Sequence, residues 1–213
     1  MEDLTLRARD SVQVFENSFV RENILFFSCP SCRGELRVDF NSVACANCGE
    51  TFDREDGLYK FFWPNDWGDG KSDVTQEIKR FYEETPFPNY DQLDDPARLR
   101  ANARKSWFAK NLDDHIPFNS RILECGCGTG QLTNFLSLSN RIVIGADLCL
   151  NSLRLANNFR EAHGLRRAFF CQMNLFRPCF KEEVFDLVVS NGVLHHTSDP
   201  KRGFHGISKL VKP

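Results

Sequence analysis

The chain has 213 residues, of which 41% are hydrophobic and 26% charged, and its formal net charge is −2. This balance excludes a disordered tail and a strongly basic nucleic-acid-binding protein, so any nucleic-acid surface has to be local. The N-terminal residues lack the apolar run of a signal peptide, and no stretch reaches the roughly 18 apolar residues of a membrane helix. We therefore expect a cytoplasmic or nuclear protein without a membrane span, whose cysteines are not paired in disulfides.

Four of the nine cysteines occur in two pairs, Cys29-Pro-Ser-Cys32 and Cys45-Ala-Asn-Cys48, which are separated by twelve residues. Two thiolates on one tight turn can bind the same ion, and two such turns supply the tetrahedral set of sulfur ligands that zinc prefers. Alternating apolar and polar residues between the pairs predict a β-hairpin. The sequence therefore predicts a small zinc-binding β module over residues 26–62, with four unligated buried cysteines as the alternative.

This module resembles the small zinc-ribbon domains that occur alone as methyltransferase-activating subunits or ahead of methyltransferase domains. Residues 1–60 contain eleven acidic and seven basic residues, a net charge of −4. Phosphate binding requires clustered cations. A structural role, or contact with a protein partner through the ribbon, is therefore favoured over nucleic-acid binding.

Residues after the ribbon read as a linker and a lid. The Pro-, Gly- and Asp-rich run from Trp63 to Asp73 marks a boundary, and Asp73 is placed to cap a helix over 74–84. The following segment RFYEETPFPNYD is similar to the aromatic segment that closes over the cofactor in many class I methyltransferases. That resemblance implies that Tyr82 and Tyr90 contact cofactor or substrate, while simple packing of the lid is the alternative.

One further helix is predicted from Asp95-Pro96 to residue 112, because a capping carboxylate followed by proline favours a helix start. Trp107 lies on its expected apolar face, with Leu99, Ala103 and Leu112. The opposite face carries Arg98, Arg104, Lys105 and Lys110. A solvated surface explains these cations, and an RNA-facing patch is the alternative.

From Arg121 onward strands and helices alternate. Apolar runs predict strands, and amphipathic runs between them predict helices: strands at 121–125, 141–148, 168–175 and 184–192, and helices at 130–138, 151–164 and 199–212. Such a rhythm indicates a parallel sheet with helices on both faces and a ligand at the carboxyl ends of the strands.

The first turn of this region, Gly126-Cys127-Gly128-Thr129-Gly130, is one residue shorter than a dinucleotide-binding loop. Glu124 precedes it, where a pyrophosphate would be repelled and a cation favoured. Asp147 ends the second strand and is placed to bind ribose hydroxyls. The pattern favours a cationic nucleoside over NAD.

In order along the chain, ILECGCGTGQL, VIGADLCLNSL, CQMNLFRPCF and FDLVVSNGVLHHTSDP resemble the class I S-adenosylmethionine-dependent methyltransferases, closest to the small-molecule group. The resemblance implies that Glu124, Gly126 and Gly128 line the methionine part of the cofactor and that Asp147 holds the ribose. It implies that Asn174 and Leu175 flank the adenine and that Asn191 and Gly192 lie beside the sulfonium. Cys127, Gly130 and Leu148 complete the expected cofactor-binding set.

Two features of the matching region leave roles open. Asn174 stands where an aspartate commonly meets adenine, and its amide carbonyl can still accept a hydrogen bond, so weaker binding is expected. His195 and His196 follow the fourth strand and are candidates for a catalytic base. In the resembling group such a pair is often part of a turn, so a structural role is the alternative.

The expected fold is α/β: a Rossmann-like parallel sheet with flanking helices, preceded by a small β zinc ribbon. We divide the chain into residues 1–63, 64–118 and 119–213. It ends where the resembling family continues with further strands, so we expect a domain that is incomplete after its fourth strand and that alone binds cofactor weakly and methylates little.

The expected activity is S-adenosylmethionine-dependent methylation of a small molecule. An RNA methyltransferase, and a non-catalytic protein that supports a partner, are the alternatives. The segment Ser190-Asn191-Gly192-Val193 differs from the Asp/Asn-Pro-Pro-aromatic motif usual in methylases of exocyclic amino groups on nucleic acids, which favours the small molecule.

Overall fold

The computed structural model describes residues 19–20, 23–39, 42–67, 73–88 and 95–213. In this part of the chain one mixed sheet holds eight strands in the order β1-β2-β3-β4-β7-β6-β5-β8. The strands are β1 (Leu36–Val38), β2 (Ser42–Cys45), β3 (Thr51–Glu55), β4 (Leu58–Lys60), β5 (Arg121–Cys125), β6 (Ile142–Asp147), β7 (Ala168–Gln172) and β8 (Leu187–Val189).

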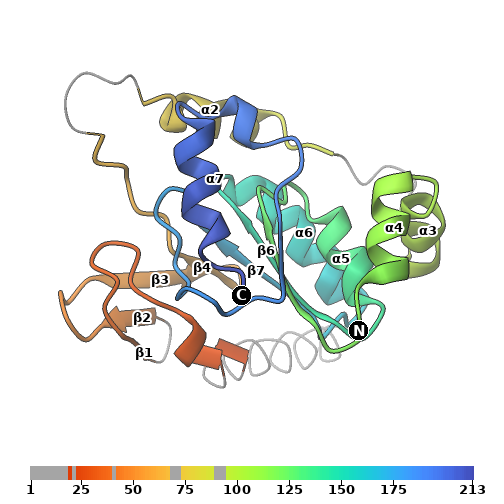
Figure 1. Ribbon diagram of the computed structural model, residues 1–213, viewed down its shortest axis with the longest axis horizontal. Coiled ribbons are helices and arrows are strands. Elements are labelled where there is room, and N and C mark those ends of the chain that lie inside the picture. The colour runs from red at the N-terminus through yellow and green to blue at the C-terminus, as the bar shows by residue number, and fades with distance from the viewer. Residues whose placement is uncertain (1–18, 21–22, 40–41, 68–72, 89–94) are drawn as a thin grey trace, which may run out of the picture.

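The parallel half of the sheet, β7-β6-β5-β8, confirms the predicted Rossmann-like fold. Helices α5 (Gln131–Ser137) and α6 (Leu150–Ala162) cover one face and α7 (Pro200–Ser208) covers the other (Figure 1). Successive residues of β5 point to opposite faces, since Ile122 packs in the cluster that contains Phe135 of α5, while Leu123 packs in the cluster that contains Ile207 of α7. Apolar runs therefore predicted these strands because both faces are covered.

The predicted ribbon module is continuous with this sheet, which the sequence did not indicate. Its strand β4 pairs in parallel with β7, with Tyr59 opposite Cys171 and Lys60 opposite Gln172. The ribbon residues Phe27 and Phe61 are fully buried in the same apolar cluster as Phe169 and Phe180 of the second half. One hydrophobic core therefore serves both the ribbon and one face of the parallel sheet.

The first cysteine turn of the ribbon is also fixed to the loop that follows β7. The guanidinium of Arg33 donates to the carbonyl oxygen of Phe180 at 2.7 Å and to that of Pro178. The amide of Ser28 donates to the Cys179 carbonyl at 2.9 Å, close to a short 3-10 helix, Ile24–Phe26. Backbone groups of the ribbon and of the α/β half therefore satisfy one another.

Three helices, α2 (Thr75–Glu84), α3 (Pro96–Ala103) and α4 (Trp107–His115), lie between the ribbon and β5 along the chain. The prediction of one helix over 95–112 was wrong, because α3 ends at Ala103 and a second helix, α4, begins after Ser106. The Ser106 hydroxyl caps α4 by accepting a hydrogen bond from the amide of Ala109 at 3.4 Å. Placing Trp107 on a buried face was wrong for the same reason, since the break turns its side chain outward and leaves it 78% exposed.

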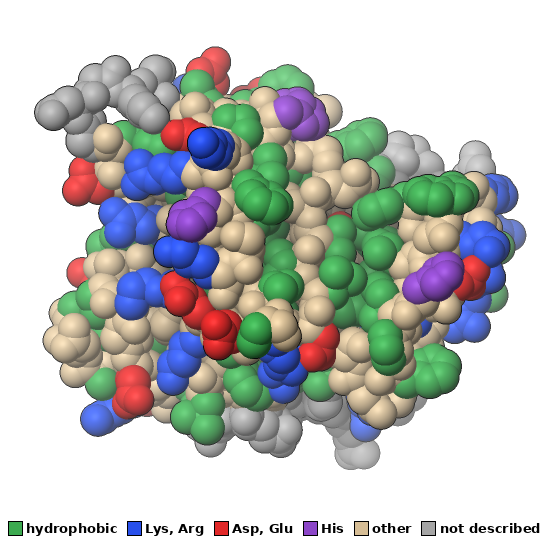
Figure 2. Space-filling model, in the orientation of Figure 1, with side chains coloured by type: hydrophobic (Ala, Val, Ile, Leu, Met, Phe, Trp, Pro, Cys, Tyr) green, Lys and Arg blue, Asp and Glu red, His purple; other side chains and the backbone are tan. Residues whose placement is uncertain are grey.

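Two of the four cations predicted on this helical region form ion pairs with neighbouring carboxylates. Arg104 contacts Asp113 at 2.8 Å and Asp114 at 3.0 Å, and Lys110 also contacts Asp114. On the face shown in Figure 2, hydrophobic side chains gather between α7 and the α3–α4 pair, while many of the Lys and Arg side chains lie around α7 and at the far side of the α3–α4 pair. No helix among the described residues is long and apolar enough to cross a membrane.

Candidate cofactor site and four-cysteine cluster

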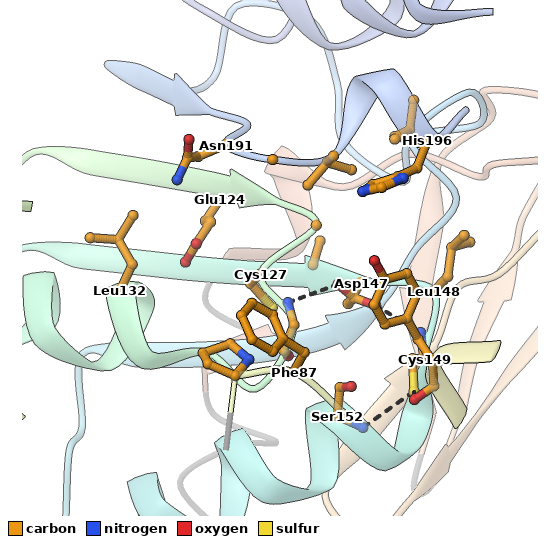
Figure 3. A pocket seen from close by; sticks show the side chains of 18 of the residues that line it. Phe87, Glu124, Cys127, Leu132, Asp147, Leu148, Cys149, Ser152, Asn191 and His196 are labelled. Carbon is orange, nitrogen blue, oxygen red and sulfur yellow. Dashed lines mark hydrogen bonds between the residues drawn. The ribbon is translucent and has the colours of Figure 1, made fainter. Parts of the chain in front are cut away.

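A cavity of about 480 Å³ lies at the carboxyl ends of the parallel strands. Its volume is within the range of ~300–1,000 Å³ that is usual for sites of small ligands. Glu124 and Asp147 reach it from the ends of the adjacent strands β5 and β6, while Asn191 and His196 approach from the segment after β8 (Figure 3). Helices α2, α3 and α4 complete the walls.

Most of the residues predicted to bind the cofactor line this cavity: Tyr82, Glu124, Gly126, Cys127, Gly128, Asp147, Leu148, Asn174, Leu175, Asn191 and Gly192. Of the two histidines, His196 lines it and His195 is not among the lining residues. Gly130 is not a lining residue either, because it packs beneath the loop where a β-carbon would overlap Phe170 and Ala156. Tyr90 lies outside the described residues.

Glu124 is a buried carboxylate on the wall of the cavity. Glu124 is only 7% exposed, and one of its carboxylate oxygens accepts a hydrogen bond from the Thr133 hydroxyl at 2.5 Å. Burial raises the pKa of Glu124 to about 7, even though the Thr133 bond opposes the shift. No ion pair joins it to any described cation, so the charged form is favoured when a cationic ligand enters.

Asp147 holds the glycine loop and the start of α6 in place. Its carboxylate accepts from the amide of Gly128 at 2.8 Å and from the amide of Cys149 at 2.9 Å. Burial raises its pKa, although these backbone bonds work against the shift. A carboxylate has further acceptor positions, so Asp147 can also accept from hydroxyl groups in the cavity.

Gly126 and Gly128 are required by both conformation and space. Both have positive φ, +76° and +53°. A β-carbon on Gly126 would overlap Val193, and one on Gly128 would overlap the carbonyl oxygen of Phe87. The loop therefore contacts the segment after β8 on one side and the lid segment on the other.

We expect Gly128→Ala to destabilise the protein more than strain alone can explain. Strain at positive φ costs roughly 1–2 kcal/mol, and overlap with the Phe87 backbone adds to it. The matched control is Gly164→Ala, since Gly164 also has positive φ, +61°, and a β-carbon added there would meet nothing within 4 Å. Equal losses of unfolding free energy in urea for the two variants would contradict the close contact between loop and lid.

Glu83 of α2 joins the lid helix to α6, and the sequence did not single it out. Its carboxylate accepts from the amides of Leu150 at 3.0 Å and Asn151 at 3.1 Å, which begin α6. The thiol of Cys149 also donates to the Tyr82 carbonyl at 3.1 Å. Burial raises the pKa of Glu83, but these amides and Lys79 outweigh it and hold the pKa below its usual value. The lid is thus fixed beside Asp147 by capping of a neighbouring helix.

The polar atoms of the Asn174 side chain already form hydrogen bonds within the protein. Its amide nitrogen donates to the Trp63 carbonyl at 2.9 Å and to the side-chain oxygen of Asn65 at 2.8 Å, and its own oxygen accepts from the Phe176 amide at 3.1 Å. An adenine contact from this side chain has to displace one of these bonds.

The two histidines lie in a short 3-10 helix, Leu194–His196, after β8. Their ring centroids are 3.9 Å apart, and the ring of Tyr82 meets that of His196 edge-on at 6.4 Å. This places His196, rather than His195, between the lid helix and the cavity.

The four cysteines of the ribbon converge. All four sulfurs lie within 4.8 Å of one another, with Cys29 and Cys48 separated by 3.7 Å and Cys32 and Cys45 by 3.5 Å. A tetrahedron with zinc–sulfur bonds of about 2.3 Å has edges of about 3.8 Å, so the sulfurs stand close to the spacing that zinc requires.

Neighbouring groups support a charged thiolate at Cys32, whereas burial raises the pKa of Cys29 to about 12. The backbone amide of Asn47 donates to the Cys45 sulfur at 3.4 Å, and its side-chain amide donates to the Cys32 sulfur at 3.5 Å. The Asn47 bond is the largest cause that lowers the pKa of Cys32, to about 6. Gly34 leaves room for the sulfurs, since a β-carbon there would approach those of Cys32 and Cys45 to 3.1 Å.

Comparison with known proteins bears on the parallel half of the sheet. A family model described as "Methyltransferase domain" matches residues 123–213. This part of the chain is similar to methyltransferase domains. A solved structure described as an S-adenosyl-L-methionine-dependent methyltransferase of Methanococcus maripaludis shares its fold, with a TM-score of 0.50, 17% identity and coverage of 69% of this chain and 64% of the other. The [4+2]-cyclase SpnF matches with a TM-score of 0.53, 18% identity and coverage of 65% and 57%.

Curated relatives of the methyltransferase domain differ in the names they carry. A ubiquinone biosynthesis O-methyltransferase of Coxiella burnetii is 29% identical over 105 residues, which is 49% of this chain and 44% of the relative. The human protein named probable tRNA methyltransferase 9B is 30% identical over 138 residues, 64% of this chain and 26% of the relative. An uncharacterized protein of Synechococcus is 29% identical over 66% of this chain and 35% of its own length. The chain thus spans less than half the length of each of these relatives.

Proposed function

We propose that the protein transfers a methyl group from S-adenosylmethionine to a small molecule. The observation that carries the proposal is the buried carboxylate of Glu124 and the half-buried carboxylate of Asp147, beside a glycine loop that lines the cavity. A buried carboxylate without a cationic partner favours a cationic ligand. Among nucleoside cofactors, S-adenosylmethionine combines a positive charge with a ribose diol. A carboxylate can attract the positive charge and can accept hydrogen bonds from the diol.

Each residue has a distinct task in this proposal. Glu124 balances the positive charge of the methionine part, Asp147 accepts from the ribose hydroxyls, and the loop from Gly126 to Gly128 allows close backbone approach. When bound, the cofactor supplies a methyl group on a positively charged sulfur. Phe87 and the apolar walls exclude water, and His196 lies where a base can take a proton from the acceptor. Alignment is the main requirement for methyl transfer, so the base is not obligatory.

Two observations favour a small molecule as the acceptor. Two of the four cations predicted for an RNA grip, Arg104 and Lys110, are engaged by Asp113 and Asp114. Relatives named ubiquinone biosynthesis O-methyltransferase match about half of the chain. RNA is the second candidate, supported by the 30% identity to the human protein named as a tRNA methyltransferase.

The same proposal includes zinc at Cys29, Cys32, Cys45 and Cys48, supported by the spacing of their sulfurs. The other five cysteines are buried free thiols, which fits a reducing compartment such as the cytoplasm. Contact of the ribbon with a protein partner stays a prediction, since the side of the ribbon that carries Arg33 is already occupied by the loop after β7.

Calorimetric titration with S-adenosylmethionine tests the cofactor assignment directly. We expect saturable binding with one site, abolished by Asp147→Ala and retained by Asp66→Ala, a change of an exposed residue outside the cavity. Transfer of a labelled methyl group is then measured on a panel of small phenols and acids and on total RNA. Binding with transfer to RNA alone would replace the small molecule by the second candidate, and absence of binding would overturn the function itself.

A further inference from the structure

Asn65, in the linker after the ribbon, joins three parts of the protein by its side-chain amide. Its oxygen accepts from Asn174 at 2.8 Å, and its nitrogen donates to the carboxylate of Asp73 at 3.1 Å and to the Thr75 hydroxyl at 3.0 Å. We call Asn174, Asn65, Asp73 and Thr75 the linker relay. Asn174 follows β7, and Thr75 is the first residue of the lid helix α2.

The direction of the hydrogen bonds in the linker relay is fixed by its two ends. Asp73 can only accept when ionised, so the nitrogen of Asn65 has to face it. At the other end the oxygen of Asn174 accepts from the Phe176 amide, so its nitrogen faces Asn65 and the Trp63 carbonyl. Rotating either amide by half a turn would place two acceptors or two donors together. The relay therefore has one arrangement that satisfies every polar atom.

Both ends of the linker relay reach the cavity and the ribbon. Thr75 and Asn174 line the cavity, and the amide of Val74 between Asp73 and Thr75 donates to the hydroxyl of Ser198 at 3.0 Å, just beyond the histidine pair. The other donor bond of Asn174 goes to Trp63, whose ring meets that of the ribbon residue Phe52 edge-on at 6.4 Å. The start of α2 is thus tied to the ribbon side, and its end is tied to α6 through Glu83.

We propose that Asn65 is a positioning residue for the cofactor cavity, which holds the start of the lid helix α2 against the wall that carries Asn174. The proposal rests on the proposed binding of S-adenosylmethionine. Asn174 is 1% exposed and Thr75 is 6% exposed, so loss of Asn65 leaves buried polar groups unpaired at the cavity wall. The Asn174 side chain therefore holds the cavity wall through its hydrogen bond to Asn65 in the linker. An aspartate at position 174, common in the resembling family, could not donate this bond.

The first test compares Asn65→Ala with Asn111→Ala. The Asn111 side chain donates a hydrogen bond to the Trp107 carbonyl within α4 and is not among the residues that line the cavity. The Asn111→Ala variant therefore reports the loss of an ordinary side-chain hydrogen bond. We expect Asn65→Ala to weaken S-adenosylmethionine binding about tenfold, the effect of losing one to two hydrogen bonds, with unchanged zinc content. Hydrogen exchange of the α2 amides should become faster. Cofactor affinity within twofold of the unmodified chain, with α2 exchange unchanged, would overturn the proposal.

The second test reverses the relay. Asn174→Asp places an acceptor against the Asn65 oxygen and should weaken cofactor binding although it introduces the acidic residue usual in the family. Adding Asp73→Asn lets Asn65 turn its nitrogen to residue 174 and its oxygen to residue 73, while the Trp63 carbonyl lacks the Asn174 donor in both variants. We expect the double variant to bind the cofactor more tightly than Asn174→Asp alone.

A double-mutant cycle gives the decisive reading. A merely structural role predicts additive losses, whereas the relay predicts coupling of about fivefold or more in affinity, as expected for one restored hydrogen bond. Additive losses would overturn the proposal. Failure of the proposed function is distinguishable, because in that case the unmodified chain itself does not bind S-adenosylmethionine.

Discussion

Removal of metal from the four-cysteine cluster should destabilise the whole described fold rather than the ribbon alone. We expect Cys45→Ser, or chelation of the native chain, to lower the thermal midpoint of a single cooperative transition. Structural zinc contributes about 10–16 kcal/mol of apparent binding free energy in small zinc domains, which rivals the total stability of about 5–15 kcal/mol of a typical domain. Because β4 pairs with β7, and Phe27 and Phe61 pack in the shared core, the loss of stability in the ribbon also destabilises the parallel sheet.

The measurement combines metal analysis with near-ultraviolet circular dichroism during heating. Cys149→Ser is the matched control, since Cys149 lies outside the cluster and serine can replace its sulfur as acceptor for the Ser152 amide at the start of α6. This control should keep about one zinc per chain. A metal-free protein that retains the tertiary signal of the parallel sheet would show that the ribbon is thermodynamically independent.

Glu124→Gln should raise the free energy of unfolding of the ligand-free protein and weaken its binding of S-adenosylmethionine. The pKa of Glu124 is raised to about 7, so the folded state binds a proton more tightly than the unfolded state. Its contribution to stability is therefore fully present below the unfolded pKa and is lost as the pH rises through about 7. At pH 8 the neutral glutamine should raise the free energy of unfolding by on the order of 2 kcal/mol.

Binding responds in the opposite sense, because the ionised carboxylate is the form that attracts a cation. For the native chain we expect affinity to rise about tenfold between pH 6 and pH 8, as the ionised fraction of a group with pKa near 7 rises. For Glu124→Gln, affinity at pH 8 should fall about 30-fold or more, the usual result of removing one partner of a buried charge pair.

Calorimetry at several pH values, together with urea unfolding, measures both effects. The ratio of the affinities of the variant and the native chain isolates Glu124 from the other carboxylate at the cavity, Asp147. Glu182→Gln, a change of an exposed carboxylate away from the cavity, is the control. A ratio that does not change with pH would contradict the role of Glu124 as the charge partner of the cofactor.

Local signals in the sequence were sufficient for part of the fold and of the site. The strand around Ile122 and Leu123 was predicted because both faces of a parallel sheet are buried, and the cysteine pairs were predicted by spacing alone. Glu124 and Asp147, which both line the cavity, were singled out because they flank a glycine-rich loop. Each of these signals lies within a few neighbouring residues.

Tertiary contacts decided the rest. Trp107 matched a helical period, but the restart of the chain at Ser106 changed its direction. Glu83 and Asn65 have ordinary polar side chains, and their functions in the fold depend on Leu150 and Asn174, which are far away in the sequence. Nothing in the spacing of the residues near Tyr59 indicated that β4 would pair with β7.

The parallel pairing of β4 with β7 has a further consequence for the solution behaviour of the protein. The outer backbone groups of Cys171 and Gln172 face Tyr59 and Lys60, and the ribbon continues the sheet with three antiparallel strands. An uncovered strand rich in apolar residues, such as β7, is a template for pairing with another chain. Loss of zinc should therefore expose the edge of β7, so that the cooperative loss of structure is accompanied by intermolecular association.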